Sequence, residues 1–105
     1  MSSIAEKLPS KNEFLSVLNS VFSVHLPEGK DFDLCLVKVD EIVSNEIQEN
    51  FTLLFKASVD APPSQSIYRL EHDLGAMEIF LVPVKKDENG LYYEAVFNHL
   101  KAVSA

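Results

Sequence analysis

The sequence has few of the residues that crosslink a chain or bind phosphate. Its 105 residues include one cysteine, so no disulfide can form within the chain, and a disulfide-stapled scaffold is excluded. Cys35 stands between Leu34 and Leu36 and is expected to be a small buried hydrophobe. Glycine occurs three times, each time in an expected turn, so the sequence has no glycine-rich phosphate-binding loop.

Basic residues are also scarce. Nine lysines and arginines stand against sixteen acidic residues, which gives a net charge of −7, and Arg69 is the only arginine. An acidic surface repels phosphate groups, so we expect neither nucleic acid nor a membrane surface among the partners. The acidic balance favours solubility and a basic partner.

The sequence shows no N-terminal signal and no apolar run of membrane-spanning length. Residues Ser2–Lys7 are polar, and the longer apolar stretches further on are broken by charged residues. We therefore predict a cytoplasmic protein. Export by a route that needs no cleavable signal stays open.

Apolar periodicity predicts one helix followed by strands. Ser10 and Glu13 form a capping box that opens a helix over Ser10–Ser20. Alternating apolar residues predict strands at residues 22–26, 32–39, 51–59 and 67–72. The pattern slips at Val37, which indicates a bulge or a strand buried on both faces. Residues Asp40–Asn50 are acidic and irregular and are expected to form a loop.

The organising segment of the chain is a long hairpin over Gly75–Leu100. Its first strand is apolar on both faces except at Glu78, so we expect it to be covered on both sides. Pro83 cannot donate a ladder hydrogen bond and marks a bulge or an edge. Asn89 and Gly90 tolerate positive φ and are expected to form the turn.

These segments predict a mainly β fold. No helical pattern separates consecutive strands, so parallel crossovers are not expected. We predict a small antiparallel β-barrel or roll of about six strands, with the N-terminal helix plugging one end. Residues 10–100 form a single β-rich domain, preceded by a flexible lead-in (1–9) and followed by a tail (101–105).

Three runs of the sequence resemble an uncharacterised family of small bacterial domains. They are YRLEHDLG (residues 68–75), EIFLVPV (residues 78–84) and YEAVFN (residues 93–98). The resemblance covers the last third of the chain well and residues 51–55 more loosely. Members of this family are often seen near phage-tail-collar-type proteins. The resemblance therefore implies a protein partner of that type and an accessory role in assembling phage-tail-like components.

Several polar residues interrupt the apolar strands and are candidate site residues. They are Tyr68, Arg69, His72, Glu78, Tyr93, Glu94 and Asn98. In a structural interpretation, Arg69 pairs with Glu78 or Glu94, and the tyrosine hydroxyls reach backbone carbonyls. In a chemical interpretation, His72 joins Glu78 or Glu94 as an acid–base or metal pair. His25, alone on an outward strand face, is expected to be solvated.

The sequence favours interaction over catalysis. It has no His-Glu-x-x-His spacing and no nucleophile-elbow serine, so we expect no metal and no cofactor. We predict a non-catalytic structural or interaction protein, with a small-ligand-binding domain or a weak acid–base enzyme as the alternative. A protein partner would use an exposed strand edge or the aromatic hairpin face. The sequence leaves open whether the chain forms a homo-oligomer.

Overall fold

The computed structural model describes residues 8–27 and 29–100. The first seven residues of the predicted lead-in and the predicted tail lie outside the described residues. Leu8, which also belongs to that lead-in, packs against the core. None of the helices in the described part is long and apolar enough to cross a membrane.

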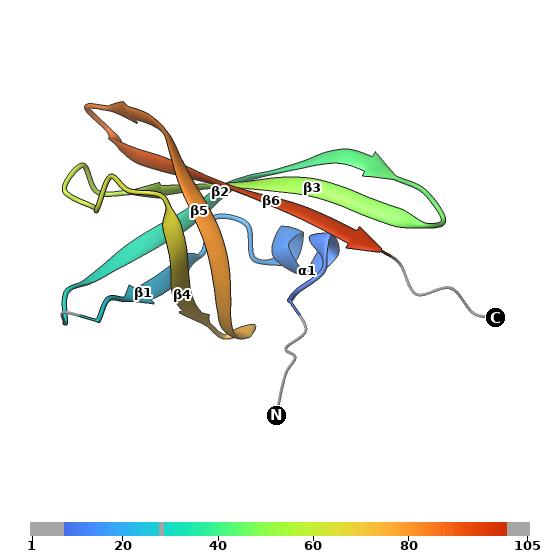
Figure 1. Cartoon of the computed structure of the whole chain (residues 1–105), viewed down its shortest axis with the longest axis horizontal. Helices are drawn as coiled ribbons and strands as arrows, with labels where there is room; N and C mark the ends of the chain where they lie inside the picture. The colour runs from blue at the N-terminus through green and yellow to red at the C-terminus, as the bar shows by residue number, and fades with distance from the viewer. Residues whose placement is uncertain (1–7, 28, 101–105) are drawn as a thin grey trace.

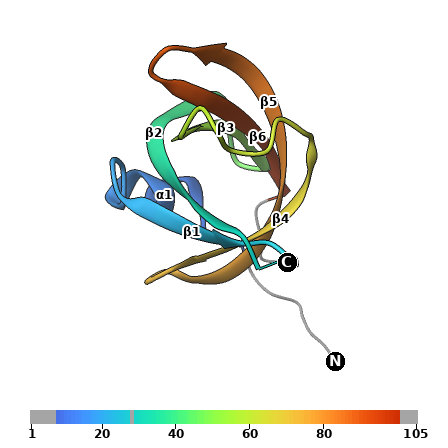
Figure 2. The same ribbon diagram turned by 90° about the vertical axis from the view of Figure 1, so that its left-hand side faces the viewer.

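Six antiparallel strands close into a ring-like sheet (Figures 1 and 2). The mainly β fold with one short N-terminal helix is thus confirmed. The order around the ring is β1-β2-β3-β6-β5-β4, and β4 returns to β1. The strands are β1 (Val21–His25), β2 (Asp31–Ser44), β3 (Gln48–Ala57), β4 (Ser66–His72), β5 (Gly75–Asp87) and β6 (Gly90–Leu100).

Helix α1 (Lys11–Ser16) begins as predicted and ends earlier than predicted. The Ser10 hydroxyl accepts the Glu13 N–H at 3.2 Å, and the Glu13 carboxylate accepts the Ser10 N–H at 2.8 Å. The helix ends where the chain turns and begins to hydrogen-bond with β2. Asn19 takes a left-handed φ of 71° and donates its N–H to the Leu36 carbonyl at 2.7 Å.

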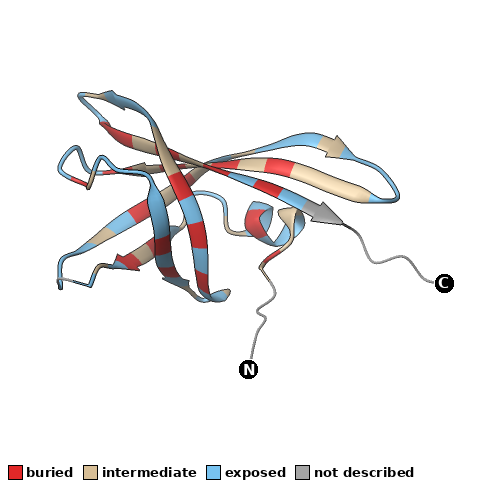
Figure 3. Cartoon of the chain, in the orientation of Figure 1, coloured by how far each residue is buried: buried red, intermediate tan, exposed pale blue. Residues whose placement is uncertain are grey.

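The inside of the ring is filled by aromatic and aliphatic side chains. Figure 3 shows burial alternating along the strands, as expected for a sheet with one inner and one outer face. At the end near α1, the Phe14 ring packs within 5.4 Å of the Phe97 centroid and 6.1 Å of that of Phe51. At the other end, the Tyr68 and Tyr93 rings meet at 6.0 Å. Phe14 therefore plugs one end of the ring, as predicted for the helix.

The acidic loop predicted over residues 40–50 is wrong. These residues continue β2 and β3 as a long hairpin, whose tip is closed by the Asn45 side chain accepting the N–H groups of Ile47 and Gln48. The apolar alternation fades here because both faces of this part of β2 meet water. Backbone pairing with β3, continuing to Ser44↔Glu49, holds the hairpin instead.

Several local predictions can be compared with the strand registers. The slip after Leu36 is a bulge, and a second bulge follows Pro83. Cys35, expected to be buried, is half-buried instead, because Leu34 and Leu36 on either side of it point inward.

The turn between β5 and β6 differs from the prediction. Gly90 has positive φ and Asn89 does not, so the expected pair of positive-φ residues in the turn is wrong. The Asp87 carboxylate holds this turn by accepting the Asn89 N–H at 2.8 Å.

Strands β5 and β6 pair only near their turn. Their register runs from Asp87↔Gly90 to Val82↔Glu94. Beyond that point β5 continues with β4 alone and β6 continues with β3 alone. Figure 1 shows β5, in orange, turning away from β6, in red. The outer face of β5 is also open, since Glu78 and Phe80 on it are exposed, which corrects the expectation that this strand is covered on both sides.

Candidate interaction cleft between strands β5 and β6

The two predicted tyrosines have a structural role. Both are buried, and the Tyr68 hydroxyl donates to the Ser64 carbonyl at 2.6 Å, while the Tyr93 hydroxyl donates to the Pro62 carbonyl. Burial raises the pKa of Tyr93, so its hydroxyl remains a donor at neutral pH. The two hydroxyls fix the connection between β3 and β4, and they reach backbone carbonyls as the structural interpretation predicts.

His72 is also held inside the fold. Its ring stacks on Phe22 with the centroids 4.2 Å apart. The Nδ1 atom accepts the Leu74 N–H at 3.1 Å, and Nε2 lies 2.8 Å from the Ser20 hydroxyl. That hydroxyl donates to the Val17 carbonyl at 2.5 Å, so its oxygen accepts the hydrogen bond from the Nε2–H group. His72 therefore ties the end of β4 to the segment between α1 and β1.

The structure does not bring His72 together with Glu78 or Glu94. His72 points inward, whereas Glu78 is on the outer face of β5 and exposed, and Glu94 is on the outer face of β6. A general base must lie within hydrogen-bond reach of the group it serves, so this trio lacks the proximity that acid–base chemistry needs. Among the described side chains, those of residues 8–27 and 29–98, no three His, Cys, Asp or Glu are grouped to hold a metal ion.

The predicted pairing of Arg69 with Glu78 or Glu94 is not formed. Arg69 and Glu78 face each other in the β4–β5 register, but the Arg69 guanidinium lies nearest Glu71, at 3.9 Å between Nε and Oε2. Among the described residues, neither Glu78 nor Glu94 has an ion-pair partner. Asn98 is exposed near the end of β6. Glu78, Glu94 and Asn98 instead line one cleft on the surface.

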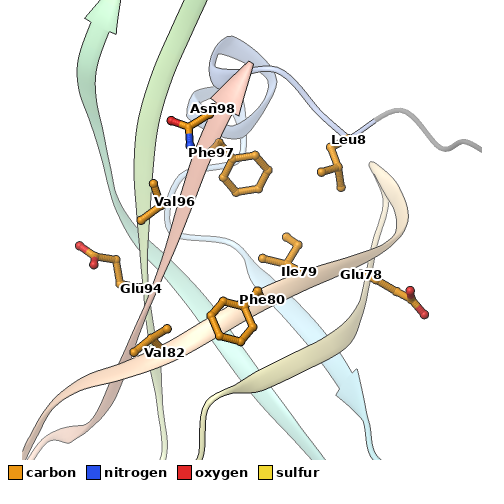
Figure 4. Close-up of a pocket in the computed structure, with 9 residues that line it drawn as sticks. All are labelled: Leu8, Glu78, Ile79, Phe80, Val82, Glu94, Val96, Phe97 and Asn98. Carbon is orange, nitrogen blue, oxygen red and sulfur yellow. The ribbon is translucent and has the colours of Figure 1, made fainter. Parts of the chain in front are cut away.

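A cleft of about 490 Å³ lies where β5 and β6 diverge. Its floor includes Ile79 and Phe97, which belong to the inner layer, and its walls include Phe80, Val82 and Val96 (Figure 4). Leu8 closes one end. The carboxylates of Glu78 and Glu94 point away from each other at opposite rims, so the polar groups of the cleft do not converge.

Large apolar side chains continue from this cleft over the outer face of the sheet. Phe80 is 51% exposed and Val96 is 58% exposed. Ile67, directly opposite Phe80 in the β4–β5 register, is 65% exposed. Scattered exposed aliphatic residues are ordinary, but a contiguous group beside a cleft is typical of a binding surface. We call Ile67, Phe80, Val82 and Val96 the outer apolar strip.

A match to a known protein family covers nearly all of this arrangement. Residues 9–97 match the model of a family described as a domain of unknown function (DUF6916). The chain belongs to this family. No curated protein and no solved structure matches the chain. The family is therefore established for this DUF6916 domain, while its activity has to be argued from the surface itself.

Sequence reasoning missed a cluster of charged residues around His25, away from the cleft of this DUF6916 domain. His25, expected only to be solvated, lies between the carboxylates of Asp31 and Glu71, with both N···O distances at 3.2 Å. The hydrogen bond with Asp31 raises the pKa of His25 above its ordinary value, and Glu71 adds to the effect. Asp31 could have been found from the β1–β2 turn, because it is directly opposite His25 in the register.

Proposed function

We propose that this DUF6916 domain is a non-catalytic interaction module that binds a protein partner at the cleft between β5 and β6. The observation that supports this proposal is the outer apolar strip, which borders a cleft whose polar groups do not converge. A site for a small polar substrate would instead present several polar groups aimed at one point.

The strip offers enough apolar surface for a modest protein contact. Full burial of a Val, Ile or Phe side chain is worth about 1.5–3 kcal/mol, and Ile67, Phe80 and Val96 are each about half to two-thirds exposed. Covering all three would therefore contribute a few kcal/mol, before the cost of ordering the partner. This strength suits a reversible docking contact.

The identity of the partner belongs to the same proposal. The sequence resemblance suggests a phage-tail-collar-type protein, with the DUF6916 domain acting in the cytoplasm as an accessory or assembly factor. A second copy of the chain is the other occupant to consider, since an outer apolar strip on each of two copies could face its equivalent.

Affinity capture from the native host, with and without the strip, tests this proposal. Phe80→Thr and Val96→Thr remove apolar surface while keeping a residue that favours strands. Val21→Thr is the matched control, because Val21 is 53% exposed on β1, which is three strands away from β6 around the ring. We expect a stoichiometric partner that is captured by the wild type and the control and lost in both cleft variants.

Two results would contradict the proposal. One is a partner captured equally by all four proteins, which would place the contact elsewhere. The other is no partner and no self-association by sedimentation at any concentration tested. Concentration-dependent dimerisation that Phe80→Thr abolishes would keep the cleft as the contact and assign it to a second copy of the chain.

A further inference from the structure

Building on the proposed function, we infer that the partner contributes an extended segment that pairs with the open edge of β6. The segment would add a strand beside Val96–Leu100, in the place that β5 vacates. Its centre would be apolar on both faces, and its flanks would carry lysine or arginine. The inference concerns how the partner is recognised, and it depends on the cleft being the contact.

The open edge of β6 supports strand addition. From Val96 to Leu100 the backbone of β6 is in register with β3 on one side only. No backbone hydrogen bond from another described segment reaches its other side over this range. Alternate N–H and C=O groups along such an edge point outward and form a template for another strand.

The distal edge of β2 is also open, but unlike the edge of β6 it is protected. Beyond Leu36, β2 is in register only with β3, but it has two bulges and charged side chains at Lys38, Asp40 and Glu41. Lys11 pairs with Glu41 beside this edge. Bulges and charges of this kind block edge-to-edge pairing. Val96, Phe97 and Asn98 of β6 include neither a charge nor a bulge.

The shape of the cleft defines the centre of the segment. Side chains of an added strand alternate between the two faces of the sheet. On the inner side they would meet Phe97 and Ile79 on the floor of the cleft, and on the outer side they would meet Val96 and Phe80. Both faces of the segment therefore contact apolar surface.

The rims of the cleft define its flanks. Glu78 and Glu94 stand at opposite sides, and within the described chain neither has an ion-pair partner. Arg69, directly opposite Glu78 in the β4–β5 register, is directed to Glu71 instead. Exposed ion pairs contribute little affinity, but they favour complementary partners and speed association. A net charge of −7 adds to this preference for a basic segment.

Selection from a ribosome-displayed library of random peptides tests this inference on the full chain. We expect the selected peptides to have alternating or continuous apolar residues between lysines and arginines. Phe80→Thr with Val96→Thr should weaken their binding about tenfold or more. Glu78→Gln with Glu94→Gln should weaken it several-fold and reduce its salt dependence. Glu46→Gln with Glu88→Gln, the same change of charge on two exposed turns, should have little effect.

Amide hydrogen exchange with the strongest selected peptide identifies the binding mode. Strand addition predicts slowed exchange at alternate residues of Val96–Leu100. Peptides that need Phe80 and Val96 but leave these amides unchanged, or that are acidic or helical, would overturn strand addition and leave the docking surface in place. Peptides insensitive to Phe80→Thr and Val96→Thr would overturn both proposals. A library that yields no binders would overturn the inference, while affinity capture would still decide the proposed function.

Discussion

Gly90 is the residue at which the β5–β6 turn comes closest to β3. A Cβ atom built on Gly90 would lie 2.4 Å from the Ala57 carbonyl oxygen, far inside contact distance. The obstacle is a backbone atom of β3, at a residue paired with Leu91 of β6, so it has little freedom to move. The turn therefore depends on glycine at this position for space.

Gly90→Ala should accordingly destabilise the domain. Overpacking of this kind costs about 1–3 kcal/mol in the free energy of unfolding. Urea denaturation followed by circular dichroism measures the change. Asn89→Ala, in the same turn, is the control and should change stability by less than about 0.5 kcal/mol. Equal stability of the two variants would show that the turn relaxes away from β3.

His25 links three strands at the narrowest seam of the ring. Strands β1 and β4 share only two register pairs, and His25 of β1 reaches Asp31 of β2 and Glu71 of β4. Its pKa is raised above the ordinary 6.5, first by the hydrogen bond with Asp31. The fold thus favours the protonated ring. This stabilisation is complete below the unfolded pKa and is lost as pH rises through the folded pKa.

The free energy of unfolding should therefore fall as pH rises from about 5.5 to about 8, and the fall should be smaller in His25→Gln. The difference between the two proteins isolates His25 from the other titrating groups. Thermal unfolding at a series of pH values measures it. If stability changed with pH in the same way in the wild type and His25→Gln, the proposed role of His25 between β1, β2 and β4 would be contradicted.

At the scale of elements, α1 acts as a plug through one side chain. Helix α1 has six residues, too few to be stable alone, and its only buried residue is Phe14. The Phe14 ring contacts those of Phe22, Phe51 and Phe97 from three different strands. The core holds the helix in place, and the helix in turn closes the core.

Phe14→Ala should cost about 3–5 kcal/mol, the range for truncating a buried phenylalanine. That is a large part of the stability of an ordinary domain, so the urea midpoint should fall sharply. Leu15→Ala, at a neighbouring position that is 43% exposed, should cost far less. Similar losses in the two variants would mean that the helix is held by more than Phe14.

The strand periodicity explains which elements the sequence could reveal. Segments with one buried and one wet face, such as Phe51–Ala57, alternate cleanly and were predicted. The distal part of β2 meets water on both faces, so its pairing left no apolar pattern to read. Phe80 and Val82 made β5 look covered on both sides, because local sequence does not distinguish apolar residues that pack inside from apolar residues that stay exposed.

The same limit applies to the candidate site. Pro83 correctly marked a bulge, but where β5 leaves β6 depends on pairing with β4 and β3, which short-range patterns do not encode. The sequence singled out Glu78 and Glu94 but misjudged their partners, since their positions follow from strand register. Tyr68 and Tyr93 were predicted well, because a buried hydroxyl must find an acceptor wherever it lies.

At the scale of the whole molecule, the ring combines a closed core with an opening where β5 and β6 diverge. Aromatic side chains fill the ring at both ends. Strands β5 and β6 separate to leave an apolar cleft and an edge of β6 with which no other described strand pairs. Unprotected strand edges favour aggregation, so a natural domain is expected to cover one of this kind. A protein partner bound at the cleft would remove this liability.

Photo-crosslinking inside the native host tests whether a protein partner covers the cleft. A photoreactive amino acid placed at Val96 should form one dominant adduct with a protein partner, and Phe80→Thr in the same chain should abolish it. The same amino acid placed at Val21, on β1, should form no such adduct. A partner crosslinked equally from both positions, or from Val21 alone, would contradict the assignment of the cleft as the docking surface.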